Sequence, residues 1–594
     1  MQINRRQALA ATALPLLGSA TTVHTATAVA DKPTAASRAL HALFDRYWQE
    51  SARRSPEWAT MRGDHRFGDR WSDLSAAGIA ERDAMNARWL AEAKAIPADG
   101  LSLTDRRSRE LFIFGRESDV REAALEGWRT MRIGSLRGTQ TSLSNLLRSV
   151  PVDNEQQVEQ LLARLDRYPT RLAQEIDSMA RGIALGWVPA RPVLERALAQ
   201  LDGQLRADLR QGPFFEPFRK LGPGIAQARR EQLRAHGEAV LTSRVLPALQ
   251  QLRSFIVERY LPAAPAAGGL LRYRGGDAVY AERVRDQTTT ALTPAQIHQM
   301  GRDELARLRG EINKVMAELK FSGSFQQFVA HLRQPEHFYP NAEALFDAYR
   351  IAAKRLDPEM PRLFAELPRA PYGIRPMPAH LGAGAADNYN RPADDGSGPG
   401  WYNANVLAFQ RRPRWAVATL VAHETVPGHH LQGARALELG DLPAFRRNAF
   451  HTAFGEGWAL YAETLCDEIG LFETPQERYG HLQAQAFRAS RLVVDTGLHA
   501  LGWSRQQAID SMIEDVGESR VYIESEVDRY LSNPGQALAY MVGKQHILAQ
   551  RDKARSRLGP QFDLRRFNNA VIDQGALPLE VLTTQIDEWV AAMG

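Results

Sequence analysis

One ten-residue stretch, HETVPGHHLQ at residues 423–432, carries residue types that could bind a metal ion and use it in catalysis. Neutral imidazoles bind zinc, and a glutamate beside a zinc ligand can take a proton from a water molecule. In the common pattern HExxH, the two histidines lie four residues apart on one face of a helix. Here position 427, where the second histidine would fall, is a proline. The stretch therefore predicts a variant zinc site with unusual spacing.

The spacing inside this stretch does not suit an uninterrupted helix. His430 is seven residues after His423 and returns to the same face, but roughly 10 Å further along the axis. His429, six residues on, would point to nearly the opposite side. Because Pro427 clashes with the preceding turn and Gly428 tolerates unusual dihedral angles, we expect the helix to be interrupted there. An interruption can return a histidine to the metal, and the spacing alone leaves both His429 and His430 open.

A third ligand is expected from a second helix. The segment FGEGWALYAETL, residues 454–465, places Glu456 between two glycines in an otherwise apolar helix. Glycine weakens a helix and allows another backbone or a ligand to come close, so this glutamate is a candidate ligand. Glu463 is either a support for the ligands or a plain salt-bridge partner, and we expect the salt bridge. The alternative for the whole set is a buried polar cluster with satisfied histidines.

Four segments, in this order, resemble the bacterial family known as domain of unknown function 885: HETVPGHHLQ, FGEGWALYAE, RLVVDTGLHALGW and NPGQALAYMVGK. The resemblance extends from about residue 40 to the C-terminus. That family is similar in turn to helical zinc peptidases of the gluzincin group, such as the oligopeptidases related to neurolysin. In those enzymes HExxH supplies two ligands and a base, and a downstream helix supplies a glutamate.

The resemblance implies that one zinc ion is held by His423, His429 and Glu456, and that Glu424 is the base. HETVPGH has two residues more than HExxH, and the HExxGH-like motif of dipeptidyl peptidase III indicates that one extra residue can be absorbed. We prefer His429 over His430 because the family motif has its first histidine directly after Pro-Gly.

Other polar residues have weaker patterns. Tyr540 in NPGQALAYMVGK could donate to the oxyanion of a tetrahedral intermediate, or it could be a core tyrosine. Lys544, one turn later, could bind a carboxylate, although we expect a solvated position. Arg491, Asp495 and His499 are spaced i, i+4 and i+8, which favours a structural charge ladder on one helical face. His499 is also a further catalytic candidate, if it faces the cleft.

The N-terminal thirty residues differ from the rest of the chain. They contain Arg5 and Arg6, an apolar run over residues 8–20, and the small residues Ala28, Val29 and Ala30. This layout predicts an export signal of the twin-arginine type, cut after Ala30. Without it, the formal charge falls by two, from +5 to +3, which does not suggest a nucleic-acid partner.

The composition is that of an ordinary globular protein, with 44% apolar and 24% charged residues over 594 positions. No later segment reaches about 18 uninterrupted apolar residues, so no transmembrane helix is expected in the mature chain. Cys466 is the single cysteine, which excludes an internal disulfide and any metal cluster built from cysteines.

The elements that must position the site are mostly helices. Residues 155–171 and 293–319 repeat apolar side chains at three- and four-residue spacing, and Thr293 is a cap candidate before Pro294. Residues 261–276 are rich in Pro, Ala and Gly and predict a linker. Residues 368–412 combine Pro and Gly with short β-prone runs and predict a small antiparallel ribbon or an irregular loop. A ribbon there could hold an extended substrate by strand addition.

We therefore predict a mainly α, zincin-like (neurolysin-like) architecture, with an N-terminal helical region at 31–262 and a catalytic region at 263–594. The predicted function is that of an exported zinc metallopeptidase acting on a peptide or small amide. Two alternatives are a zinc amidase or esterase with a non-peptide substrate, and a helical periplasmic binding protein without catalysis. The sequence does not indicate the side-chain preference, endo- or exo-action, or the oligomeric state.

Overall fold

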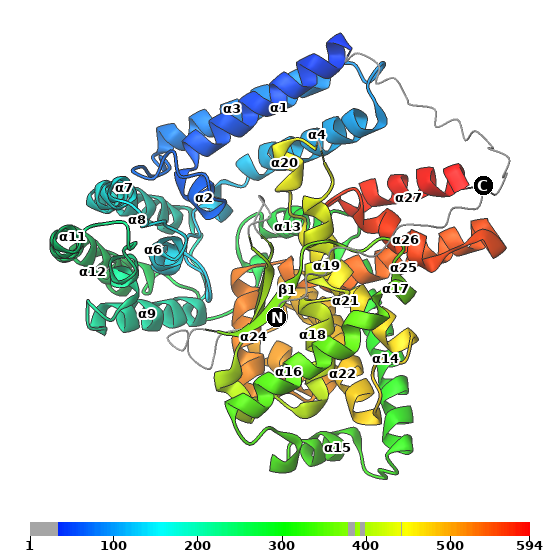
Figure 1. Cartoon of the computed structure of the whole chain (residues 1–594). Helices are drawn as coiled ribbons and strands as arrows, with labels where there is room; N and C mark the ends of the chain where they lie inside the picture. The colour runs from blue at the N-terminus through cyan, green and yellow to red at the C-terminus, as the bar shows by residue number, and fades with distance from the viewer. Residues whose placement is uncertain (1–33, 378–386, 393–397, 441, 594) are drawn as a thin grey trace, which may run out of the picture.

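The computed structural model describes residues 34–377, 387–392, 398–440 and 442–593 (Figure 1). This part of the chain is mainly helical, as predicted, with one small sheet. The expected export signal at 1–30 lies outside the described residues. Within the described ranges, none of the helices combines the length and apolarity that crossing a lipid bilayer requires.

The N-terminal part consists of a layer of three long helices, α1, α3 and α4, followed by a bundle formed mainly by α6 to α12 (blue to green in Figure 1). Apolar side chains between residues 133 and 260 form a core of their own inside the bundle. The helices are α1 (Ala35–Arg54), α2 (Pro56–Met61), α3 (Ala76–Ala95), α4 (Leu103–Ala123), α5 (Glu126–Arg129), α6 (Thr139–Leu147), α7 (Glu155–Asp166), α8 (Tyr168–Leu185), α9 (Arg191–Arg206), α10 (Glu216–Arg219), α11 (Gln227–Val240) and α12 (Leu246–Phe255).

The C-terminal part contains the largest apolar core, which, apart from Leu111 and Trp187, is built from residues between 270 and 590. Irregular chain at residues 261–269 connects it to the bundle, which confirms the first part of the linker predicted over 261–276; a short 3-10 turn follows at Leu270–Arg272. Its helices are α13 (Gly276–Thr288), α14 (Pro294–Glu318), α15 (Phe325–Leu332), α16 (Ala342–Leu356), α17 (Met360–Leu363), α18 (Val417–Glu424), α19 (His429–Leu437), α20 (Ala444–Arg447), α21 (Thr452–Glu468), α22 (Pro475–Ala500), α23 (Arg505–Val516), α24 (Arg520–Ser532), α25 (Ala539–Leu558), α26 (Leu564–Ile572) and α27 (Leu579–Met593).

Helix α14 begins where the sequence predicted. The Thr293 side chain accepts from the Gln296 backbone, the Gln296 side chain returns the bond, and Pro294 occupies the first turn. This reciprocal capping satisfies two backbone donors that the helix itself cannot. The helix expected over residues 155–171 is instead divided between α7 and α8 at Arg167.

The small sheet differs from the predicted antiparallel ribbon. Its strands are β1 (Tyr372–Pro376), β2 (Asn388–Asn390) and β3 (Gly400–Ala404), in the order β1-β3-β2. Strand β2 pairs with β3 antiparallel, but β1 pairs with β3 in parallel, with Tyr372 opposite Gly400. A parallel pair needs a long connection, which the chain between β1 and β3 provides.

Close glycine contacts bring the central helices together. A Cβ on Gly457 of α21 would lie 2.5 Å from the Cα of Gly543 on α25, so these two backbones touch where neither residue has a side chain. Likewise, a Cβ on Gly301 of α14 would lie 2.7 Å from the Cβ of Leu492 on α22. Any larger residue at Gly457 would push α21 away from α25.

Helix α22 carries the predicted charge ladder in its buried part. Each member of the ladder finds its partners on another element instead of pairing with the next member. The Arg491 guanidinium donates to Glu526 at 3.0 Å, and Asp495 accepts a hydrogen bond of 2.7 Å from the Tyr280 hydroxyl. The ladder therefore joins α22 to α24 and α13, which is a structural role.

Replacing Asp495 by Asn is expected to remove a pH-dependent loss of stability. Burial raises the pKa of Asp495 to about 7, against the hydrogen bonds from Tyr280 and the Gly535 N–H, which favour the ionised form. The folded state binds the Asp495 proton more tightly than the unfolded state does, so protonation of Asp495 stabilises the fold. This stabilisation is complete below the unfolded pKa of about 3.9 and is lost as the pH rises through 7. Between about pH 5 and pH 8.5, the gap in unfolding free energy between Asp495→Asn and wild type should grow by roughly 3 kcal/mol in favour of the variant.

Denaturant unfolding followed by circular dichroism at the two pH values measures this gap. Asp510→Asn, at an exposed carboxylate on α23, is the matched control and should show no comparable change. A gap for Asp495→Asn that does not change with pH would contradict the prediction.

Candidate metal centre

The histidine stretch forms the end of one helix and the start of the next. Helix α18 ends at Glu424 and α19 begins at His429, so the predicted interruption at Pro427 and Gly428 is confirmed. The Gly428 N–H donates to the carbonyl oxygen of Ala422 at 3.0 Å, which folds the chain back against α18. A Cβ on Gly428 would lie 2.0 Å from the His423 carbonyl oxygen, so only glycine fits there.

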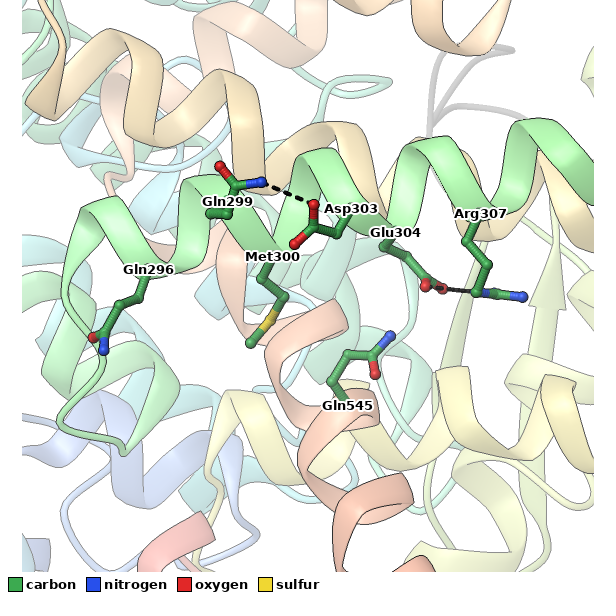
Figure 2. A pocket seen from close by; sticks show the side chains of 7 residues that line it. All are labelled: Gln296, Gln299, Met300, Asp303, Glu304, Arg307 and Gln545. Carbon is green, nitrogen blue, oxygen red and sulfur yellow. Dashed lines mark hydrogen bonds and ion pairs between the residues drawn. The ribbon is translucent and has the colours of Figure 1, made fainter.

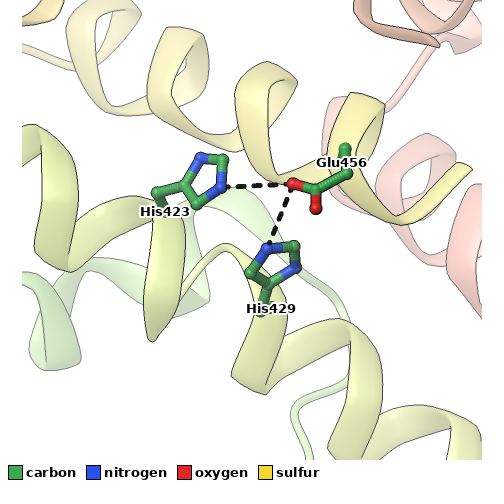
Figure 3. A group of neighbouring side chains, drawn as sticks. All are labelled: His423, His429 and Glu456. Atoms are coloured by element: carbon green, nitrogen blue, oxygen red, sulfur yellow. Dashed lines mark ion pairs between the residues drawn. The ribbon is translucent and has the colours of Figure 1, made fainter. Parts of the chain in front are cut away.

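This turn brings His423 and His429 together with Glu456 of α21 (Figure 3). The two Nε2 atoms lie 3.6 and 3.5 Å from Glu456 Oε2, and all three potential ligand atoms lie within 4.8 Å of one another. A tetrahedral zinc ion with bonds of about 2.0–2.1 Å keeps its ligand atoms roughly 3.3 Å apart. The donor types and their spacing therefore fit one zinc ion. Among the described residues, this is the one such group of histidines and carboxylates.

Electrostatics couple the three side chains. Burial alone would lower the pKa of His423, but its interactions with Glu456 and Glu463 outweigh this and raise the pKa to about 9. Burial would raise the pKa of Glu456, but the two imidazoles hold it well below its usual range. The carboxylate at Glu456 is therefore ionised, as a metal ligand must be.

Glu463 lies directly behind His423, so the partner in its expected salt bridge is itself a candidate metal ligand. Its Oε1 accepts from His423 Nδ1 at 2.8 Å, and its Oε2 accepts from the Thr419 hydroxyl at 3.1 Å. Because a carboxylate accepts, Nδ1 carries a proton, so Nε2, on the side of Glu456, is the nitrogen whose lone pair is offered when His423 gives up a proton to bind a metal ion. This is the carboxylate–histidine arrangement that orients metal ligands in proteins.

A chain of buried hydrogen bonds continues behind Glu463. Gln485 on α22 donates from Nε2 to Glu463 Oε2 at 3.0 Å, and Lys544 donates to Gln485 Oε1 at 2.8 Å. Because a lysine ammonium can only donate, it holds the Gln485 amide with its NH2 group toward Glu463. Lys544 is 2% exposed, so the solvated position expected for it is wrong.

The outer end of this chain reaches a surface hollow of about 500 Å³ (Figure 2). Lys544 also pairs with Glu304 of α14 at 3.5 Å, and Glu304 pairs with Arg307. The lining consists of Gln296, Gln299, Met300, Asp303, Glu304, Arg307 and Gln545. None of the three grouped residues of the metal centre lines this hollow, so it is separate from the site.

Glu424 is buried next to the two histidines. The residue is 7% exposed, and burial raises the pKa of its carboxyl, an effect that the nearby His429 and His423 partly oppose. No described residue donates a hydrogen bond to Glu424. Its acceptor capacity is therefore available to a water molecule or a substrate group.

His430 points away from the cluster. Its Nε2 lies 3.1 Å from the carbonyl oxygen of Ala370, to which it must donate, so Nδ1 accepts from the Tyr389 hydroxyl at 3.0 Å. Burial lowers the pKa of His430 to about 4, which keeps the ring neutral. Both ring nitrogens are thus used near the sheet, and His429 is the histidine that faces Glu456.

The structure does not bring His499 to this cluster. Its Nδ1 accepts from the Leu270 N–H at 3.1 Å, and its Nε2 donates to the Tyr530 carbonyl at 3.2 Å. Its ring stacks on Tyr280 with centroids 5.1 Å apart. Burial lowers the pKa of His499 to about 4, so the residue is a neutral, fully bonded part of the core.

Tyr540 lies half-buried near the start of α25, with the guanidinium of Arg491 4.6 Å from its ring centroid. The same helix touches α21 through Gly543, which meets the residue following Glu456. The oxyanion role of Tyr540 stays a prediction.

Two residues that support the site were not found from the sequence. Trp458 donates from its indole N–H to the Pro427 carbonyl at 3.0 Å, which holds the interruption from α21. Its position two residues after Glu456 in GEGW was a possible signal. In an apolar helix, however, a tryptophan is expected to be an ordinary core residue. Tyr389 stacks parallel to His429, with centroids 6.5 Å apart, and no sequence periodicity connects these two positions.

Comparison with known proteins supports the family suggested by the four motifs. The family model described as "Bacterial protein of unknown function (DUF885)" matches residues 56–586. A solved structure described as a putative lipoprotein from Colwellia psychrerythraea is 27% identical, with a TM-score of 0.88, and the match covers 94% of this chain and 100% of that one. A putative lipoprotein of unknown function from Shewanella oneidensis is 17% identical, with a TM-score of 0.73, and the match covers 93% of this chain and 99% of that one. At this identity the similarity shows the fold alone.

No curated protein matches the chain. Because the family model covers most of its length, the chain belongs to the bacterial DUF885 family of proteins of unknown function.

Proposed function

We propose that this protein is a zinc-dependent hydrolase, specifically a metallopeptidase with one zinc ion held by His423, His429 and Glu456. The observation that carries the proposal is the convergence of these three ligand atoms within 4.8 Å, with Glu463 oriented behind His423. Two imidazoles and one carboxylate, with room for a fourth ligand, form a typical catalytic zinc site. The proposed gluzincin-like architecture rests on the same set: a helix with the HE pair and a second helix with the glutamate.

When bound, the ion would supply Lewis-acid chemistry, lowering the pKa of a water molecule and polarising the carbonyl of the scissile amide. Glu424 accepts the proton from that water and passes it to the leaving nitrogen. Burial raises the pKa of Glu424, which brings it nearer to neutral pH and improves its match to both transfers. Glu463 keeps the proton of His423 on Nδ1 throughout. Tyr540 is proposed to donate to the oxyanion.

We also propose that the protein is exported and acts on peptides or small amides. Two observations support export: the arginine pair and apolar run at the N-terminus, and the description of both similar solved structures as putative lipoproteins. Peptide as the substrate follows from the similarity of the ligand pattern to the helical zinc peptidases. An amidase or esterase would share the same ligands and base.

Exchanging Glu424 for Gln should separate metal binding from hydrolysis. We expect Glu424→Gln to retain one zinc per chain, because Glu424 is not a ligand, and to lose about 10²–10⁴-fold in turnover. Zinc content is measured by elemental analysis and turnover on peptide, acyl-amino-acid and ester libraries. His429→Gln should lose zinc, whereas the matched variant His430→Gln should keep it. Unchanged turnover in Glu424→Gln would overturn the mechanism, and loss of zinc from His430→Gln alone would reverse the assignment of the ligand.

Removing the carboxylate behind His423 should weaken zinc binding. We expect Glu463→Gln to lower zinc affinity roughly 10–100-fold, since partners of this kind orient the ligand and raise its basicity. Lys544→Met should act in the same direction with a smaller effect, because Gln485 loses the donor that orients its amide. Competition against a chromogenic chelator measures both affinities. Glu468→Gln, on the same helix but paired with Arg551, is the control and should bind zinc like wild type. Equal affinities for Glu463→Gln and this control would refute the supporting role.

A further inference from the structure

An exposed aromatic side chain lies against α21, the helix that supplies Glu456 to the proposed metal centre. Phe450 precedes α21 and is 67% exposed. A Cβ built on Gly455 would lie 3.2 Å from the ring carbon Cε2 of Phe450, so the ring lies against the residue just before Glu456. Gly455 thus leaves room for the ring, whereas Gly457 on the same helix leaves room for α25.

The ring also lies near the second helix that carries ligands. The same Cβ point on Gly455 is 4.0 Å from Oε1 of Gln432, which follows His429 by three residues on α19. Phe450 is therefore found where α19 and α21 approach each other. The side chains of His429 and Glu456 are 19% and 18% exposed, against 5% for His423, so solvent reaches the cluster mainly through those two residues.

A nearby phenylalanine shows that this exposure is specific to Phe450. Phe445, on α20, packs into the N-terminal layer, with ring centroids 4.7 Å from Phe44 and 5.5 Å from Phe112. Phe450 follows five residues later and leaves most of its ring in water. Single exposed apolar residues are common on protein surfaces, but one beside the two helices that carry metal-ligand candidates can offer apolar contact to a molecule bound there.

A second aromatic ring adds to this apolar character. Tyr389 lies nearly parallel to the His429 ring, with an interplanar angle of 18°. Its hydroxyl already donates to His430, so what it offers toward His429 is ring surface. Both aromatic rings therefore present carbon, not free polar groups, beside the ligand-bearing helices.

We infer that Phe450 is a specificity-determining residue that contacts a large apolar side chain of the substrate next to the bond that is cleaved. This inference rests on the proposed function and names its substrate class: peptides with Phe, Leu or a similar residue beside the scissile bond. Covering the ring with such a side chain removes apolar surface of both partners from water, which a serine or glutamate cannot match.

The test compares peptides that differ only at a residue flanking the scissile bond, with Phe, Leu, Ser or Glu there. In Phe450→Ser, the ratio of kcat/KM for the Phe peptide over the Ser peptide should fall about 10-fold. Phe450→Leu should keep most of the selectivity. Val521→Ser, which removes a 77% exposed side chain from α24, should leave the ratio unchanged. Zinc content should be the same in all four proteins.

A binding measurement separates this inference from the proposed hydrolysis. Calorimetric titration of the same peptides into Glu424→Gln and into Glu424→Gln/Phe450→Ser should show an apolar preference in the first protein that falls about 10-fold in the second. Binding with this preference, but without turnover by wild type, would support the apolar contact of Phe450 with a bound peptide and overturn the proposed hydrolase. An unchanged ratio, an equal loss for all peptides, or no binding of any peptide would overturn the role of Phe450.

Discussion

Between Glu424 and His429 the backbone leaves the helical path, and this departure sets the direction of His429 relative to His423 in the candidate site. On a continuous helix, a residue six positions after His423 would point to nearly the opposite side. The turn instead folds Gly428 onto the carbonyl end of α18, where a side chain would collide with the His423 carbonyl. Trp458 holds the other side of the turn through the Pro427 carbonyl. Metal-ligand candidates that are close in sequence thus become close in space.

The second constraint is the burial of charge. Carboxylates and ammonium groups are costly to remove from water unless each meets a partner of suitable geometry. Here Glu463 accepts hydrogen bonds from His423, Thr419 and Gln485. Gln485 in turn accepts a hydrogen bond from Lys544. The chain spans α18, α21, α22 and α25, so the contacts that satisfy buried charge also connect the helices around the centre. The direction of these hydrogen bonds is set at one end by Lys544, whose ammonium group can only donate. At the other end, His423 donates to Glu463 and turns its second ring nitrogen toward the ligand position.

Several helix boundaries and candidate ligands could be predicted from local sequence. Thr293 and Pro294 mark the start of α14, because capping depends on residues within one turn. Glu456 was recognisable because an acidic residue between two glycines is anomalous in an apolar helix. Lys544 was misjudged, because periodicity reveals an amphipathic helix but not one packed on several sides, as α25 is against α21, α22 and α27. The parallel pairing of β1 with β3 was missed because strand propensity does not specify the partner strand.

The sequence by itself determined which donor atoms are present, that the helix must break at Pro427 and Gly428, and that the chain belongs to its family. His429 and His430 are neighbours in the chain, so the spacing from His423 leaves both as candidates for the same metal ion. Only the tertiary structure decided between them, because ring direction depends on partners distant in sequence. Tyr389 and the Ala370 carbonyl use both nitrogens of His430, and this leaves His429 to face Glu456.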